Sequence, residues 1–210
     1  MAVITHVLPV TSFQQNCSIL ICEQTGAAAI VDPGGEPLRL QEFLRSLEVF
    51  PVTILLTHAH VDHAGAAAVL AERLRLPIQG PHTGDRFLVR SLRLQGILLS
   101  IPSARSFRPT RWLRHEDTVR FGKVELQVLH CPGHTPGHVV FFDADSRLAF
   151  VGDVVFREGI GRSDLPGGRR RILLRSIHER LLPLGDDVRF VAGHGPMSTL
   201  GWERNHNPFL

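Results

Sequence analysis

Seven histidine and aspartate side chains follow apolar segments in this chain, and this pattern constrains its fold more than any other feature. These residues are His58, His60, Asp62, His63, His134, Asp153 and His194. Apolar runs end directly before Thr57-His58, Gly152-Asp153 and Gly193-His194. Because the carboxyl ends of strands meet at one edge of an open sheet, we expect the seven side chains to converge there. The sequence therefore predicts an α/β protein whose site lies at a sheet edge.

The types of these side chains predict a metal site. Histidine and aspartate together suit zinc, iron or manganese. Seven ligands are too many for one tetrahedral ion, and they fit two divalent ions, zinc first among them, that share one carboxylate. Two such ions can hold a hydroxide between them and polarise a substrate oxygen. The pattern therefore indicates metal-dependent catalysis.

The spacing within residues 57–63 divides four of the ligands between two ions. His58 and His60 are two positions apart and can bind one ion from an extended loop. Asp62 and His63 follow at the start of a predicted helix, where they turn toward a second ion. Four ligand types within six positions seldom serve packing, so we interpret this cluster as functional.

The three ligands outside the cluster would complete the two groups. His134 would join the first ion, His194 would join the second, and Asp153 would bridge both. A metal would also relieve the cost of a carboxylate that follows an apolar strand. Taken singly, His134 and His194 would be read as loop histidines and Asp153 as a turn or cap residue. The histidines that we interpret as non-ligands are His6, His82, His115, His130, His138, His178 and His206.

Length and composition predict one ordinary globular domain over residues 1–210, with 43% hydrophobic and 20% charged residues. The net charge is +3, but the arginines are scattered, so we expect no nucleic-acid partner. Cys17, Cys22 and Cys131 show no disulfide framework, which fits a cytoplasmic protein. No segment resembles a signal peptide or has the length and apolar character of a membrane span, so we expect no membrane association.

Hydrophobic periodicity predicts strands and helices in both halves of the chain. Strands are predicted over residues 3–10, 17–22, 27–31, 52–56, 77–80, 118–121, 123–129, 139–142, 148–151 and 188–192. Helices are predicted over residues 36–47, 64–74, 82–95 and 169–182, and a loop over residues 156–168. The two halves share a plan of strands followed by helices, which predicts a pseudo-symmetric pair of sheets with helices outside.

With these features the chain resembles the metallo-β-lactamase superfamily, and within it the glyoxalase II-like group of hydroxyacylglutathione hydrolases. Residues 57–63, Thr-His-Ala-His-Val-Asp-His, match the superfamily signature. Asp32, residues 133–138, Gly152-Asp153 and residues 193–195 follow in the expected order and spacing. The resemblance covers nearly the whole chain. It implies a four-layer αββα sandwich with a dinuclear site at one edge of the paired sheets.

The resemblance also implies roles for individual residues. The ligands of one ion would be His58, His60 and His134, those of the other would be Asp62, His63 and His194, and Asp153 would bridge. Asp32 would contact ligands on the side away from the metal ions and orient them.

Two features place the chain among the branches of this superfamily. Glyoxalase II proper has a C-terminal helical extension with basic and tyrosine contacts to glutathione, whereas this chain contains no tyrosine and ends soon after His194. Residues 159–168 and 195–199 instead resemble a shorter bacterial-type branch. The Gly-Arg-Ser-Asp portion also resembles persulfide dioxygenases, which use one iron held by the equivalents of His58, His134 and Asp153.

These features lead to one main hypothesis. A metal-bound hydroxide would attack the carbonyl carbon of a small-molecule thioester of the S-lactoylglutathione type, and the thiolate would leave. Asp62 would accept or orient the proton. Arg162 would bind a substrate carboxylate, or would be a structural arginine paired with Asp164.

Two other readings compete with thioester hydrolysis. One is a mononuclear iron persulfide dioxygenase, and another is a non-catalytic metal-binding protein on the same fold. A true β-lactamase is disfavoured, because that branch typically has cysteine where Asp153 stands. Nucleic-acid processing is disfavoured as well, because such relatives need an additional domain.

Overall fold

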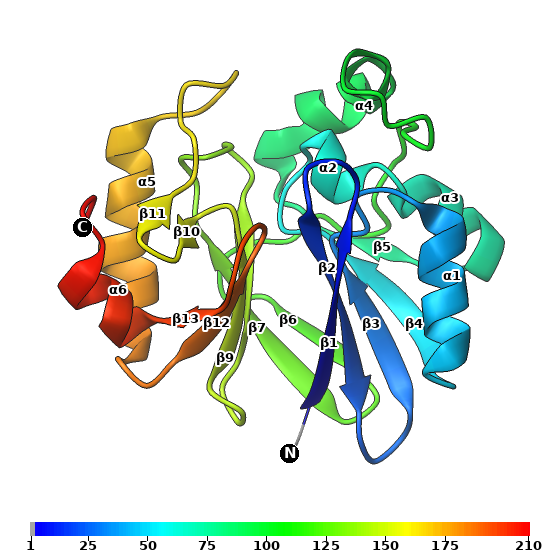
Figure 1. Ribbon diagram of the computed structural model, residues 1–210, viewed down its shortest axis with the longest axis horizontal. Coiled ribbons are helices and arrows are strands. Elements are labelled where there is room, and N and C mark those ends of the chain that lie inside the picture. The colour runs from blue at the N-terminus through cyan, green and yellow to red at the C-terminus, as the bar shows by residue number, and fades with distance from the viewer. Residues whose placement is uncertain (1–2) are drawn as a thin grey trace.

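Two β-sheets pack face to face in the computed structural model, which describes residues 3–210 (Figure 1). The strands of the first sheet lie in the order β1 (Val3–Val10), β2 (Gln15–Cys22), β3 (Ala27–Val31), β4 (Phe50–Leu55) and β5 (Ile78–Gln79). Those of the second lie in the order β13 (Ser198–Thr199), β12 (Arg189–Ala192), β9 (Leu148–Gly152), β8 (Val139–Asp143), β7 (Val124–His130) and β6 (Thr118–Phe121). β10 (Val155–Phe156) and β11 (Gly159–Ile160) form a separate hairpin.

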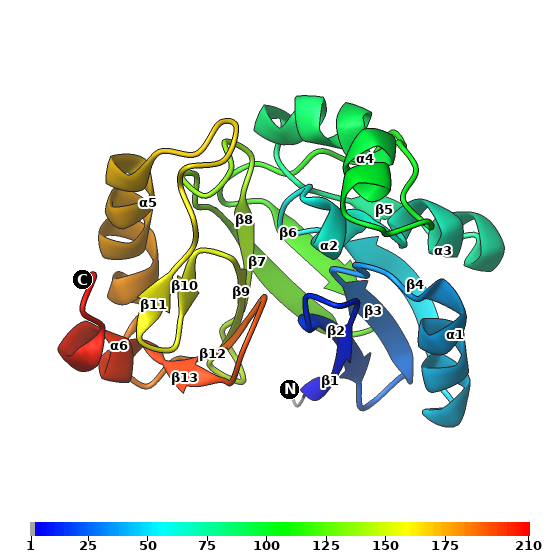
Figure 2. The ribbon, with the colours of Figure 1, turned by 45° about the horizontal axis from the view of Figure 1, so that its top comes forward.

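Helices cover the outer face of each sheet (Figures 1 and 2). Those on the side of the first sheet are α1 (Pro37–Ser46), α2 (Val61–Ala64), α3 (Ala67–Leu74), a 3-10 turn (Thr83–Asp85) and α4 (Arg86–Leu98). Those on the side of the second are α5 (Arg170–Ser176), a π turn (Ile177–Leu181), a 3-10 turn (Leu182–Leu184) and α6 (Leu200–His206). The expected αββα sandwich is therefore confirmed. Within residues 3–210, no helix has both the length and the apolar character that a bilayer crossing requires.

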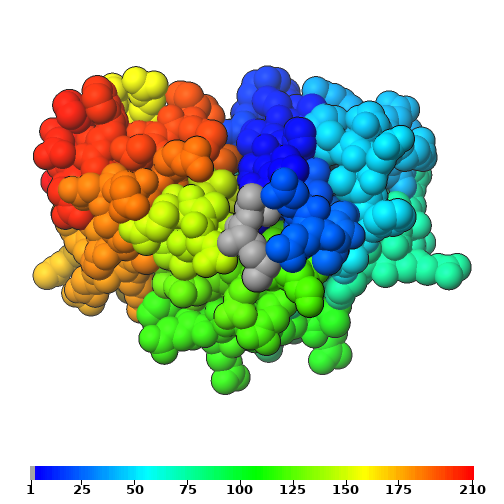
Figure 3. All heavy atoms as spheres, turned by 90° about the horizontal axis from the view of Figure 1, so that it is seen from below, coloured from blue at the N-terminus to red at the C-terminus, as the bar shows by residue number. Residues whose placement is uncertain are grey.

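Alternation along the strands builds three apolar layers between the four structural layers. In β2, Ile19 packs with the helices of the first half, and Leu20 packs against the second sheet. In β8, Phe141 faces the first sheet, whereas Val140 packs toward α5. Successive side chains of a strand point to opposite faces, so strands covered on both faces are apolar throughout. Seen from below, the blue part of the first sheet lies directly beside yellow-green and orange parts of the second half (Figure 3).

Parallel strand pairs bring the ends of three strands to one edge of the sandwich. β4 runs parallel to both β3 and β5 in the first sheet, and β12 runs parallel to β9 in the second. β4 ends at Leu55, β9 at Gly152 and β12 at Ala192. The segments that follow these three ends carry six of the seven predicted ligands.

The helix predicted over residues 64–74 is interrupted in the structure. α2 ends at Ala64 and α3 begins at Ala67. A Cβ atom at Gly65 would lie 2.4 Å from the carbonyl oxygen of Gly34, so only glycine allows this close approach. The amide of Ala66 donates to the carbonyl of Pro33 at 2.9 Å. The break therefore fixes α2 against the turn that follows β3.

Other differences lie in short elements. The helix predicted over residues 82–95 begins as a 3-10 turn and continues to Leu98, and the helix predicted over residues 169–182 passes into a π turn after Ser176. The loop predicted over residues 156–168 contains β11. No element is predicted beyond His194, where the structure has β13 and α6. Two-residue strands such as β11 and β13 are too short to show a hydrophobic period.

Candidate metal centre

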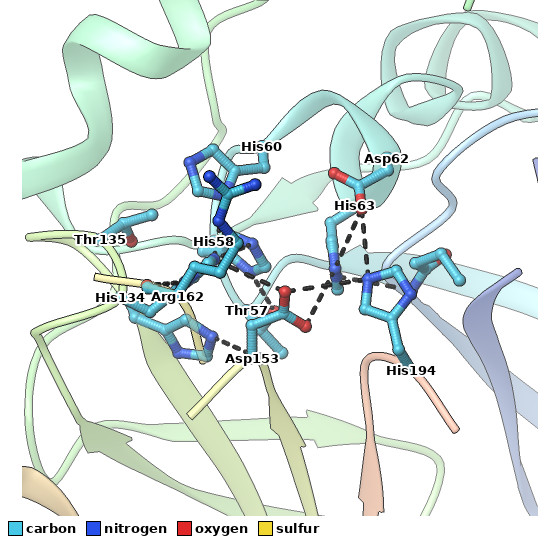
Figure 4. Close-up of polar contacts among 12 residues, drawn as sticks. Thr57, His58, His60, Asp62, His63, His134, Thr135, Asp153, Arg162 and His194 are labelled. Atoms are coloured by element: carbon cyan, nitrogen blue, oxygen red, sulfur yellow. Dashed lines mark hydrogen bonds and ion pairs between the residues drawn. The ribbon is translucent and has the colours of Figure 1, made fainter. Parts of the chain in front are cut away.

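The structure brings all seven predicted ligands together at the edge where β4, β9 and β12 end (Figure 4). His58 and His60 lie in the loop after β4, and Asp62 and His63 lie on α2. Asp153 follows β9 and His194 follows β12. His134 comes from the loop between β7 and β8. The seven side chains therefore come from both halves of the chain.

Three histidines form the first group. Nδ1 of His60 lies 2.9 Å from Nε2 of His134, which lies 3.3 Å from Nε2 of His58. Two nitrogens that bind one tetrahedral zinc ion at ~2.0–2.1 Å are roughly 3.3 Å apart. The spacing of this group therefore fits one ion.

Asp62, His63 and His194 form the second group. Oδ2 of Asp62 lies 3.2 Å from Nε2 of His194 and 3.8 Å from Nε2 of His63. Because all three donor atoms face one another, this group could also hold one ion.

Asp153 lies between the two groups. Its Oδ1 is 3.3 Å from Nε2 of His63, and its Oδ2 is 3.6 Å from Nε2 of His134 and 3.8 Å from Nε2 of His194. One carboxylate therefore faces donors of both groups, which is the position that a bridging ligand requires.

Two buried atoms at the centre lack the hydrogen bonds that burial normally demands. Nε2 of His63 and Oδ1 of Asp153 have no hydrogen-bond partner within the described residues. Buried polar atoms without partners are costly. A divalent cation would satisfy both atoms, so the residues present fit a bound metal.

The opposite ring nitrogens of three histidines are held by acceptors. Nδ1 of His134 lies 2.6 Å from the carbonyl oxygen of Arg162, and Nδ1 of His194 lies 3.0 Å from the carbonyl oxygen of Phe13. Nδ1 of His63 lies 2.9 Å from Oδ2 of Asp32. Each acceptor favours the tautomer with a proton on Nδ1. Nε2 then stays free to bind a metal ion.

Asp32 connects β4 to the second group, as the resemblance implies for this residue. Besides His63, it accepts hydrogen bonds from the amide of Thr57 at 2.7 Å and from the Thr57 hydroxyl at 2.5 Å. The Thr57 hydroxyl in turn lies 3.0 Å from Nδ1 of His58. One buried carboxylate thus positions a histidine of each group.

The surroundings of the first group favour the neutral form of its three histidines. Burial, together with the neighbouring His63, lowers the pKa of His58 well below its ordinary value. Burial and the adjacent His134 lower the pKa of His60 to about 4, and burial also lowers the pKa of His134. Neutral imidazole is the form that binds metal ions.

In the second group, and in Asp153 beside it, carboxylates and histidines shift one another's pKa in opposite directions. Burial alone would raise the pKa of Asp153 and of Asp62, but the nearby His63 outweighs it and lowers both. The carboxylates of Asp153 and Asp62 conversely raise the pKa of His63 well above its ordinary value, against the effect of burial. Hydrogen bonding to Asp62 likewise raises the pKa of His194 against burial. A bound cation would compete with these protons for the same nitrogens.

Asp85 is a site residue that the sequence does not reveal. Its Oδ2 accepts from the amide of Ala59 at 3.0 Å and from the hydroxyl of Thr135 at 2.9 Å, and its Oδ1 accepts from the amide of Gly137 at 2.6 Å. Burial raises its pKa to about 6. The side chain therefore ties the loop that carries His58 and His60 to the loop that carries His134. A single aspartate within a predicted helix gives no signal of this role.

His138 supports Asp153 without belonging to either group. Its Nε2 accepts from the amide of Asp153 at 3.1 Å, and its ring stacks on His58 at 4.6 Å between centroids. The ring is fully buried. The sequence signal for this role was that His138 ends the motif of residues 133–138, which also contains His134.

A cavity of about 450 Å³ opens over the two groups. Five apolar side chains line it beside the ligands: Phe13, Val61, Leu99, Phe156 and Leu165. Arg162 is the one cationic side chain among the lining residues, and it extends toward His60 (Figure 4). It also forms a bidentate pair with Asp164, at 2.8 and 3.1 Å. A larger hollow of about 970 Å³ beside α4 contains none of the seven ligands, so it is not this site.

Comparisons with known proteins agree with this geometry. The family model described as the metallo-beta-lactamase superfamily matches residues 10–194. Hydroxyacylglutathione hydrolase GloC of Haemophilus influenzae is 44% identical over 206 residues, which cover 98% of this chain and 97% of that protein.

Two solved structures are similar over almost their whole length. The B3 metallo-beta-lactamase BLEG-1 is 35% identical, with a TM-score of 0.90 over 98% of this chain and 99% of that one. TTHA1623, solved in a di-iron-bound form, is 38% identical, with a TM-score of 0.88 over 98% of this chain and 100% of that one.

Proposed function

This chain belongs to the metallo-β-lactamase superfamily, and from that premise we propose that it is a metal-dependent hydrolase that cleaves thioesters of the S-lactoylglutathione type. The observation that carries the proposal is the Asp153 carboxylate, which faces a group of three histidines on one side and a second group of three ligands on the other. The similarity to GloC, a hydroxyacylglutathione hydrolase, supports the thioester as the substrate class.

We assign the metal ligands as the two groups described above. One ion would be held by His58, His60 and His134, and the other by Asp62, His63 and His194, with Asp153 shared. Zinc is our first choice because histidine and aspartate suit it. The di-iron form of TTHA1623 makes iron the second choice. Bound ions would lower the pKa of water to near neutrality and polarise the thioester carbonyl.

The chain's own residues supply the remaining parts of the reaction. Water adds to the carbonyl carbon, the C–S bond breaks, and the products are a carboxylate and a thiol. Asp62 lines the cavity and would accept or orient the proton of the attacking water. Apolar walls around the cavity keep bulk water away and strengthen electrostatic interactions inside it.

Arg162 is our candidate for binding a substrate carboxylate. Its pair with Asp164 is exposed, with 68% of each side chain accessible. Exposed ion pairs contribute little to stability, so a substrate carboxylate can replace Asp164 at little cost.

Metal content and thioester hydrolysis test the proposal together. We expect about two ions per chain in freshly purified protein and release of thiol from S-lactoylglutathione. Protein treated with a chelator should lose hydrolysis and regain it when zinc is added. About one iron per chain, with oxygen uptake in the presence of glutathione persulfide, would contradict the hydrolase and favour the dioxygenase.

The similarity to BLEG-1 favours one second candidate, hydrolysis of a β-lactam amide. The same two metal groups would serve, because attack on a lactam carbonyl needs the same polarisation. A chromogenic cephalosporin tests this candidate. Turnover with a kcat/KM above that for S-lactoylglutathione would make the β-lactam the preferred substrate.

The three cysteines support a cytoplasmic location for this enzyme. Cys17, Cys22 and Cys131 are all free and buried. Unpaired thiols suit a reducing compartment.

A further inference from the structure

Two phenylalanine rings flank one side of the cavity, next to His194. The carbonyl of Phe13 accepts from Nδ1 of His194 at 3.0 Å, and the Phe156 ring meets the His194 ring edge-on at 6.2 Å between centroids. Both phenylalanines line the cavity. The Phe13 side chain is 40% exposed, so apolar ring surface faces the space above the metal groups.

Arg162, the one arginine or lysine among the described residues that line the cavity, lies on the other side. Arg162 follows β11, and its carbonyl oxygen is 2.6 Å from Nδ1 of His134. Gln95, the uncharged polar side chain of the lining, is already engaged: its Oε1 accepts from the Val61 amide and its Nε2 donates to the Leu88 carbonyl. A substrate anion can therefore be recognised at the His134 side and not at the His194 side.

This asymmetry orients a thioester. The carbonyl carbon must lie over the two metal groups, between His134 and His194. Glutathione carries carboxylates on the thiol side of the bond, so that part belongs beside Arg162. The acyl group then points toward His194 and contacts Phe13 and Phe156.

We propose that Phe13 and Phe156 form an acyl-binding wall, and that the enzyme prefers 2-hydroxyacyl thioesters with an aromatic or bulky apolar acyl group over lactoyl thioesters. This inference rests on the proposed thioester hydrolysis. An aromatic acyl group would cover the exposed ring of Phe13 and remove apolar surface from water, whereas a methyl group covers little of it.

A matched pair of substrates tests the wall. S-lactoylglutathione and S-mandeloylglutathione share the thiol and the 2-hydroxyl group and differ only by methyl against phenyl. Each kcat/KM is divided by the rate of the same thioester with free hydroxide, which removes intrinsic reactivity. We expect the corrected value to be on the order of tenfold higher for the mandeloyl thioester, because a few additional buried carbons give discrimination of this size.

Phe13→Ala removes the ring and keeps the backbone carbonyl that holds His194. We expect it to lower the mandeloyl-to-lactoyl ratio of kcat/KM values about tenfold. Phe156→Leu is the second variant, because Phe156 also packs in the second half's core and leucine preserves most of that packing. Phe50→Ala is the control: Phe50 is 72% exposed at the first residue of β4, the end away from the metal groups, and its ratio should equal the wild-type value.

Each outcome decides a different question. Equal corrected values for the two thioesters, or a ratio unchanged by Phe13→Ala, would overturn the acyl-binding wall and leave thioester hydrolysis intact. Failure of the folded, zinc-loaded protein to hydrolyse either thioester would overturn both proposals.

Discussion

At the scale of single residues, two buried atoms of the centre have no hydrogen-bond partner among residues 3–210. These atoms, Oδ1 of Asp153 and Nε2 of His63, face each other at 3.3 Å, and a bound cation would satisfy both. Nδ1 of four ligand histidines instead has a partner on the side away from the centre: Thr57 for His58, Asp32 for His63, and a backbone carbonyl for each of His134 and His194. Substitution of a ligand and substitution of a residue that positions a ligand are therefore expected to affect metal binding and hydrolysis differently.

Asp153→Asn tests the shared carboxylate. The variant keeps the shape of the side chain and removes the charge that faces both groups, so we expect fewer bound ions and a loss of at least about a hundredfold in kcat for thioester hydrolysis. Elemental analysis and thiol release measure the two effects. Asp143→Asn is the matched control, because Asp143 is also buried and ends β8, where it bonds Ser146 away from the site. Full metal content and activity in Asp153→Asn would contradict the assignment.

Asp32→Asn tests the positioning of His63. Asparagine would accept from the Thr57 amide and turn its NH2 group toward Nδ1 of His63, so the imidazole would shift its proton to Nε2. We expect the ion of the second group, which His63 would hold, to bind roughly 10–100-fold more weakly, and the ion of the first group, which Asp32 reaches only through Thr57, to be affected less. The left-handed backbone at Asp32, with φ 51°, is one that asparagine tolerates, so the fold should persist. Zinc titration of chelator-treated protein, with NMR of the His63 tautomer, would show the effect; unchanged binding of both ions would refute it.

At the scale of elements, the ligand loops are held as a pair by Asp85. Its carboxylate bonds Ala59 on one loop and Thr135 and Gly137 on the other. This contact does not involve a ligand side chain. The 3-10 turn that ends at Asp85 therefore sets the distance between the two loops.

The pKa of Asp85 predicts a specific pH dependence of stability. Its folded value of about 6 lies above the ordinary value of 3.8, so its contribution to stability is fully present at low pH and is lost as the pH rises through about 6. The free energy of unfolding of the wild type, relative to Asp85→Asn, should fall by about 2 kcal/mol between pH 4.5 and pH 7.5. Urea denaturation of the two chelated proteins measures this difference, and groups common to both cancel. A difference that rises with pH would contradict the assignment.

The sequence predicted the strands and the convergence of the seven side chains better than it predicted the connections. The cluster of His58, His60, Asp62 and His63 was recognisable because its ligands are adjacent in sequence. Asp85 and the break at Gly65 were not, because each depends on a backbone contact with a segment distant in sequence. Long apolar strands can be recognised from their composition, whereas a single carboxylate that accepts hydrogen bonds from two loops has no sequence pattern.

At the scale of the whole molecule, the metal groups join the two halves of the sandwich. His58, His60 and Asp62 come from the first half, and His134 and His194 come from the second. The same edge is also connected by backbone, because the Asn16 amide donates to the Gly193 carbonyl at 2.8 Å. Ions bound by ligands from both halves are expected to stabilise the folded protein as a unit.

Metal removal should therefore lower thermal stability. Zinc at a thousand times its dissociation constant adds about 4 kcal/mol to the folded state. For a chain of 210 residues this corresponds to roughly 10 °C in Tm. Calorimetry with zinc and with a chelator measures the difference, and Asp153→Asn should show a smaller one. Identical Tm values for the wild type under both conditions would mean that no ion bridges the halves.

The contact between His194 and Phe13 has a consequence for synthesis of the protein. A carbonyl near the first turn of the chain positions a ligand that the ribosome adds only after β12, and the two residues lie 181 positions apart. A nascent chain that has passed β9 already holds six of the seven ligands. The last one, His194, follows β12, so the complete centre forms only after β12 has been made. Any ion acquired earlier must be held without His194, by the other six side chains.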